Sequence, residues 1–183
     1  MSFKNTTKEW GGLAKVFHWL TVVVLIAAWV AVALHEGAEK DSPDYIKYIL
    51  LHKSLGLSLL AVVLARLLWR LSNVTPSPIK MPALQRQAAY FVHGMLYVLI
   101  LAMPISGVIM SQLAGKPVSW FGLFDVPQFM EVNKEMAKDV KALHEDVFFP
   151  VLSMITSCSL SLEIDTASFS HHKILKKITS KNF

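Results

Sequence analysis

Apolar residues gather in four long runs along the chain, and shorter polar links separate them. The runs predict helices at about 14–34, 48–71, 88–112 and 144–162. A helix of about 20 apolar residues crosses the hydrocarbon core of a bilayer. The pattern therefore predicts an all-α integral membrane four-helix bundle, in which residues 1–183 form a single transmembrane domain.

Charge placement gives the expected topology. Of the 183 residues 54% are hydrophobic, and the net charge of +5 is spread over the ends of the apolar runs. That spread argues against a nucleic-acid surface and favours topology determinants. Lys and Arg concentrate in residues 4–15, in and beside the link 72–87, and at the C-terminus, so both termini and that link are predicted to be cytoplasmic. We expect an interfacial segment over 113–140, with a short amphipathic helix as one form it could take.

Two features narrow the chemistry. The first apolar run is long enough to span and has no small-residue cleavage site before it, so it reads as a retained helix and not as a signal peptide. The single cysteine, Cys158, excludes an intramolecular disulfide and a multi-cysteine metal cluster held by this chain alone. Histidine is therefore the metal ligand to consider.

His52 lies near the start of the second apolar run, where an ionisable side chain must be hydrogen-bonded, face a cavity or bind a metal. Gly56 follows at i+4 on the same helix face and leaves a gap that a flat cofactor could use. The plainer interpretation is a histidine that reaches the headgroups beside Lys53.

The predicted topology sorts the histidines by depth. His52 and His144 both fall near the outer ends of their helices, whereas His18 and His93 fall near the inner surface. Paired histidines at two levels of a helix bundle are typical of haem b with axial imidazole ligands. Zinc is disfavoured because no carboxylate or thiol accompanies either pair at ligand spacing. A proton relay remains an alternative.

Four strings carry a family resemblance: FHWL at 17–20, LHKSLGL with ARLLWR over 51–70, AMPISG at 102–107 and LHE at 143–145. In this order they resemble the bacterial cytochrome b561 family over about 15–151. The resemblance implies a multi-pass dihaem protein of the bacterial inner (plasma) membrane, related to the cytochrome b subunits of hydrogenases and formate dehydrogenases.

The implied function is haem b electron transfer between a donor and the quinone pool. In the family the proposed donor is superoxide and the acceptor ubiquinone, so a superoxide:ubiquinone-type oxidoreductase is one expectation, and whether the chain is itself an enzyme stays open. Nothing in the sequence identifies the donor. The alternatives are a membrane-anchor cytochrome b subunit of a dehydrogenase complex and a degenerate, haem-poor family member.

The resemblance also implies ligands. His52 and His144 would hold the outer haem, and His18 would hold the inner haem with a histidine fourteen residues after His144. Cys158 occupies that position, and from about residue 153 the sequence departs from the family, with Glu163 and Asp165 at apolar positions. A frameshift or damaged gene copy explains the departure, and so does a changed ligand. The candidate replacement ligands are His93, Met154 and Cys158. One or two haems are therefore expected.

Arg66 comes fourteen residues after His52, at the inner depth and on nearly the same helix face. A counter-charge to haem propionates and a headgroup anchor are equally good interpretations of this residue.

Overall fold

The computed structural model describes residues 2–77 and 82–154. Its elements in chain order are three long helices, a small hairpin and a fourth helical segment: α1 (Gly12–Gly37), α2 (Pro43–Ser72), α3 (Ala83–Leu113), β1 (Ser119–Trp120), β2 (Phe124–Asp125), α4 (Lys134–Ala142) and the π-helical turn η1 (Leu143–Phe148). Helical structure continues after η1 through residues 149–154.

The three first apolar runs form helices as predicted, and each helix extends beyond its run into the polar links. At the start of α2 the reason is local. The Ser42 side chain accepts a hydrogen bond from the backbone N–H of Tyr45, and Pro43 occupies the first helical turn, where its missing N–H costs nothing. α3 continues through the buried Pro104.

α1, α2 and α3 are each long and apolar enough to cross a membrane. Their outward faces carry large apolar side chains, such as Val23, Leu68 and Val98, each at least 60% exposed. Such faces are solvated by lipid tails, not by water. The chain is therefore a multi-pass membrane protein, and the orientation of its termini stays a prediction.

The expected start of the fourth helix, near residue 144, is wrong by about ten residues. α4 begins at Lys134, where the Asn133 side chain accepts a hydrogen bond from the N–H of Met136 and caps the helix. The amphipathic helix considered for 113–140 is the polar first part of this helix, which runs on without a break into His144. Residues 155–162 of the predicted helix lie outside the described residues.

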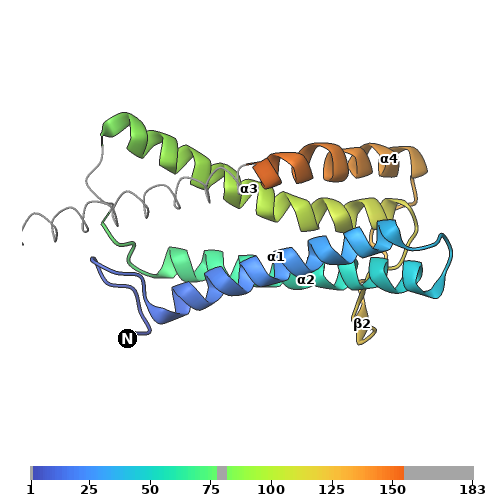
Figure 1. The fold of residues 1–183 in the computed structure, drawn as a ribbon, viewed down its shortest axis with the longest axis horizontal. Helices are drawn as coiled ribbons and strands as arrows, with labels where there is room; N and C mark the ends of the chain where they lie inside the picture. The colour runs from blue at the N-terminus through green and yellow to red at the C-terminus, as the bar shows by residue number, and fades with distance from the viewer. Residues whose placement is uncertain (1, 78–81, 155–183) are drawn as a thin grey trace, which may run out of the picture.

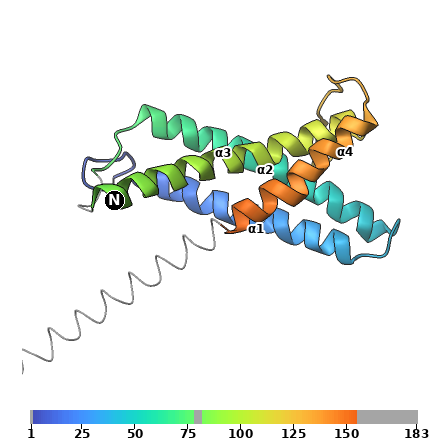
Figure 2. The same cartoon turned by 90° about the horizontal axis from the view of Figure 1, so that it is seen from above.

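The helices form two antiparallel pairs. Figure 1 shows α1 beside α2 and α3 beside α4, and these two pairs make extensive contacts. Figure 2 shows the fourth helical segment crossing over the middle of the molecule toward α1. The space between the two pairs is where a buried site can form.

The link between α3 and α4 is bound to α2 through serine side chains. Ser54, which is 3% exposed, donates to the carbonyl of Ser119 and accepts from the N–H of Phe121. The indole N–H of Trp120 donates to Ser58 Oγ. These bonds satisfy backbone groups of the hairpin and hold the link against α2.

Candidate functional site

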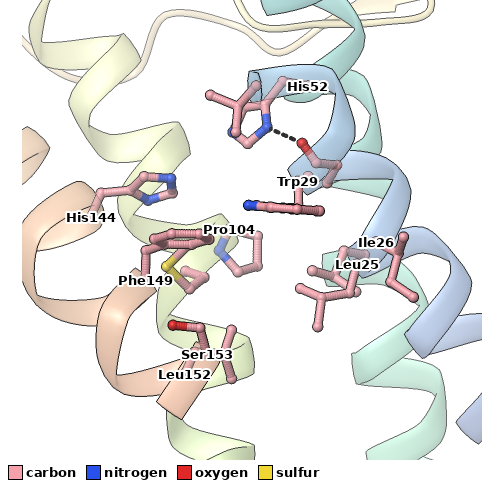
Figure 3. A pocket seen from close by; sticks show the side chains of 14 residues that line it. Leu25, Ile26, Trp29, His52, Pro104, His144, Phe149, Leu152 and Ser153 are labelled. Carbon is pink, nitrogen blue, oxygen red and sulfur yellow. Dashed lines mark hydrogen bonds between the residues drawn. The ribbon is translucent and has the colours of Figure 1, made fainter. Parts of the chain in front are cut away.

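A cavity of about 290 Å³ lies between the two helix pairs (Figure 3). α1, α2, α3 and the fourth helical segment all contribute to its wall, and most of the lining side chains are apolar. The lining includes Leu25, Ala28, Trp29 and Val32 of α1, His52, Gly56 and Leu59 of α2, Met103 and Pro104 of α3, and His144, Phe149, Leu152 and Ser153 of the fourth helical segment. Two histidines are the ionisable groups among these residues.

His52 and His144 reach into this cavity from opposite helix pairs (Figure 3). Their ring centres lie 6.3 Å apart and the ring planes are nearly perpendicular, at 88°. Two metal–nitrogen bonds of about 2 Å each, plus the distance from each nitrogen to its ring centre, give about 6 Å between ring centres of two ligands on opposite sides of one metal. The spacing therefore suits a single metal ion between the rings.

The tautomer of His52 follows from its hydrogen bond to α1. Its Nδ1 lies 2.8 Å from the carbonyl oxygen of Ala28, and a carbonyl can only accept. Nδ1 therefore carries the proton and donates it. The Nε2 lone pair is left for a metal, which is the usual arrangement of a metal-binding histidine.

His144 is held in the same way by α3. Its Nδ1 lies 2.9 Å from Ser106 Oγ, which is itself 2.9 Å from the carbonyl of Met103. The hydroxyl has one proton, and donating it to the carbonyl leaves Oγ to accept from Nδ1–H. The ring is only 7% exposed, so this bond also satisfies a buried polar group.

Gly107, next to Ser106, gives the His144 ring room. A Cβ at this position would lie 3.3 Å from His144 Cε1, closer than ordinary contact. Gly56 lines the cavity with open space where a Cβ would be. Gly107 therefore leaves room for the imidazole of His144, and Gly56 leaves room for a molecule in the cavity.

His144 lies in the π-helical turn η1, and Pro150 supplies the physical reason for that turn. Proline has no N–H to donate, and in a regular α-helix its ring would collide with the carbonyl four residues earlier, at Asp146. The wider turn over Leu143–Phe148 avoids that collision. π-turns inside helices are frequent at functional sites because they re-aim side chains.

His18, the third predicted ligand, is not part of this cavity. Its Nδ1 lies 3.3 Å from a guanidinium nitrogen of Arg66, which can only donate. The neutral ring then carries its proton on Nε2, the opposite tautomer to His52 and His144. His18 as a ligand of an inner haem stays a prediction.

The three candidate replacement ligands for the inner haem lie in different surroundings. His93 is exposed, and its Nδ1 bonds to the carbonyl of Ala89 one turn back on its own helix. Met154 is exposed at the end of the described segment. Cys158 lies outside the described residues.

The donor set limits the kind of metal group that fits. In the described ranges, no group of three or more His, Cys, Asp or Glu side chains could hold a metal ion. A site with two protein ligands suits a cofactor that brings its own in-plane ligands, and haem is such a group. The apolar lining and the gap at Gly56 fit a flat, largely apolar molecule.

Sequence reasoning identified the histidine pair and missed its supports. Ser106 and Gly107 lie within the string AMPISG, and the spacing of the string gave no sign that both residues face His144. The Ala28 carbonyl could not be found from side-chain types at all, because a backbone group carries that role.

Together the fold and site define a multi-pass membrane helix bundle with a pair of cavity-lining histidines suited to a flat metal cofactor. The model of the prokaryotic cytochrome b561 family matches residues 9–156.

Individual proteins agree. Cytochrome b561 homolog 2 of Escherichia coli strain K12 is 33% identical over 99% of this chain and 94% of its own length. The probable superoxide oxidase CybB of Yersinia pestis is 28% identical over 94% of this chain and 93% of its own length. Cytochrome b561 homolog 1 of E. coli K12 is 30% identical over 70% and 73%. The chain belongs to the prokaryotic cytochrome b561 family, whose members bind haem b and carry electrons in membranes.

Two glycines of α3 make a matched pair for testing the site. Gly107→Ala places a methyl group against His144, whereas a Cβ at Gly94 meets nothing within 4 Å. We expect Gly107→Ala to lower the haem bound per purified chain severalfold and Gly94→Ala to leave it unchanged. Absorbance of the haem against protein concentration measures both. Equal haem content in the two variants would contradict the contact between Gly107 and His144.

Proposed function

We propose that this chain is a haem b electron-transfer protein in which His52 and His144 are the axial ligands of one haem. The observation that carries the proposal is the pair of Nδ1 hydrogen bonds. Each ring donates to a fixed acceptor, Ala28 O or Ser106 Oγ, so that both Nε2 lone pairs are left for one metal across an apolar cavity.

The residues around the pair hold and insulate it. Bound haem supplies a metal that changes its charge by one electron. Ala28 and Ser106 fix the rotation of the two rings, and fixed rings lose little freedom on binding. Leu59, Met103 and Phe149 give the cavity an apolar wall that keeps water away from the two imidazoles.

We further propose that electrons pass to the quinone pool and that superoxide is the donor. The cavity wall on α1 includes Ile26 and Trp29, each about half exposed on the bundle surface that faces lipid. Among the described residues nothing separates this edge from the bilayer, where quinones dissolve. The name of the Yersinia pestis relative, a probable superoxide oxidase, favours superoxide as the donor.

The proposed location is the bacterial inner membrane, with both termini and the link 72–87 in the cytoplasm. The positive-inside distribution of Lys and Arg supports this orientation, and membership of the family supports the membrane. His52 and His144 then lie toward the periplasmic side.

The second haem of the family has weak support in this chain. His18 accepts from Arg66 and is held in the tautomer that does not bind through Nε2. The family resemblance assigns the partner to the position of Cys158, whose thiol would have to ionise in a low-dielectric setting to bind well. We therefore propose about one tightly bound haem per chain.

Loss of either axial ligand should remove the same haem. We expect His52→Ala and His144→Ala each to abolish most of the b-type absorbance, because a single remaining imidazole holds the haem poorly. His35→Ala is the control, since this histidine bonds to the Tyr45 carbonyl outside the cavity. Variants that lose two spectroscopically different haems would show that the pairing is wrong.

The electron donor and acceptor can be tested on purified protein in vesicles. We expect a superoxide source to reduce the haem within mixing time and added ubiquinone to reoxidise it, with superoxide dismutase preventing the reduction. A haem that superoxide leaves oxidised, in a protein that copurifies with a dehydrogenase, would indicate a membrane-anchor subunit instead.

The haem stoichiometry has a separate test. We expect the wild-type chain to bind about one haem and Cys158→His to bind more, because an imidazole binds without ionising. Quantitative haem extraction against amino-acid analysis gives the ratio. A wild-type ratio of two, reduced by His93→Ala, would show that α3 supplies the inner ligand.

A further inference from the structure

A cluster of cationic and aromatic side chains lies at the opposite end of the bundle from His52, where α1 begins and α2 ends. Arg66 and Arg70 are one turn apart on α2, with their guanidinium carbons 5.5 and 5.3 Å from the ring centre of Tyr97 on α3. Arg70 also donates to the Tyr97 hydroxyl, at 3.3 Å. We call Arg66, Arg70 and Tyr97 the arginine–tyrosine cluster.

Two further segments border this cluster. The Arg70 guanidinium lies 5.9 Å from the ring centre of Trp10, which precedes α1. Arg66 donates to His18 on α1. Three helices and the N-terminal segment therefore converge on two guanidinium groups, which lie against the rings of Tyr97 and Trp10.

The positive charge of the cluster has no acidic partner in the part of the chain that the structure describes. The ion pair found there joins Lys141 to Glu145, on the fourth helical segment. Arg66 and Arg70 are both half-buried, and two like charges one turn apart repel more strongly where water is scarce. Aromatic faces offset part of this repulsion, and an anion between the guanidinium groups would offset more.

The side chains of this part of α2 have N–H donors that an anion could use. Each guanidinium has five N–H groups in a fork that matches phosphate oxygens, and the described contacts use only a few of them. Trp69, on the same turn of α2, has its indole N–H buried without an acceptor among the described residues. A donor without a partner is costly, and an anionic oxygen would satisfy it.

We propose that the arginine–tyrosine cluster is a binding site for a phosphate group. Its depth favours the headgroup of a phospholipid as the source, because Arg66 and Arg70 lie six and two residues before the end of a membrane-spanning helix. Inorganic phosphate has the same chemistry and is the second source. The site is independent of the haem proposed at His52 and His144, which lies about 21 Å away along α2.

Native mass spectrometry of the purified haem-loaded protein tests the site. Detergent-solubilised chain is mixed with phosphatidylglycerol, and retained lipid is counted for the wild type, for Arg66→Gln with Arg70→Gln, and for Arg86→Gln. Arg86 is the control because it is an exposed arginine on the first turns of α3, at the same end but outside the cluster. We expect the double variant to retain lipid at least about tenfold less well, since two charge-assisted contacts are lost.

Other outcomes separate the sources. A thermal shift with inorganic phosphate that the double variant abolishes, without any difference in lipid retention, would support the site and assign it to free phosphate. Equal lipid retention and equal phosphate response in the double variant and Arg86→Gln would overturn the proposal. Loss of haem from the double variant, with lipid retention unchanged, would also overturn it, because the arginines would then serve the haem.

Discussion

Two hydrogen bonds, from His52 Nδ1 to the Ala28 carbonyl and from His144 Nδ1 to Ser106, determine what the interior of this bundle can bind. An imidazole in an apolar environment must place both of its nitrogens, because an unsatisfied polar atom there is costly. With Nδ1 satisfied by the protein, each ring has one nitrogen still to satisfy. A metal between the two rings satisfies both at once, which is why the pair is better explained by a cofactor than by packing.

The rest of the fold supplies those two acceptors at the right places. Ala28 on α1 holds the ring of His52, which lies on the neighbouring α2. Ser106 on α3 holds the ring of His144, which lies on the neighbouring fourth helical segment. The π-turn before Pro150 aims His144 toward the cavity, and Gly107 lets its ring lie against α3. The surroundings of His18 differ from those of the pair, because its Nδ1 faces an arginine, which can only donate.

Depth can be inferred from the sequence because apolar runs fix where each residue lies relative to the membrane. That is why the amino-acid sequence alone pairs His52 with His144, although the two residues are far apart along the chain. The supports could not be predicted, since a backbone carbonyl has no residue type and Ser106 resembles any helix serine. The start of α4 was misplaced because its first nine residues are polar, and hydropathy cannot distinguish a polar helix from a loop. The ligand expected at or near Cys158 stays a prediction from the sequence, because this position lies outside the described residues.

The central claim, one haem held between His52 and His144, is tested most directly by electron paramagnetic resonance of the oxidised protein. Two neutral imidazole ligands make ferric haem low-spin, and ring planes near 88° predict the strongly anisotropic form of that signal. We expect this signal in the wild type and its loss in His144→Ala. A high-spin signal in the wild type, or a low-spin signal that persists without His144, would contradict it.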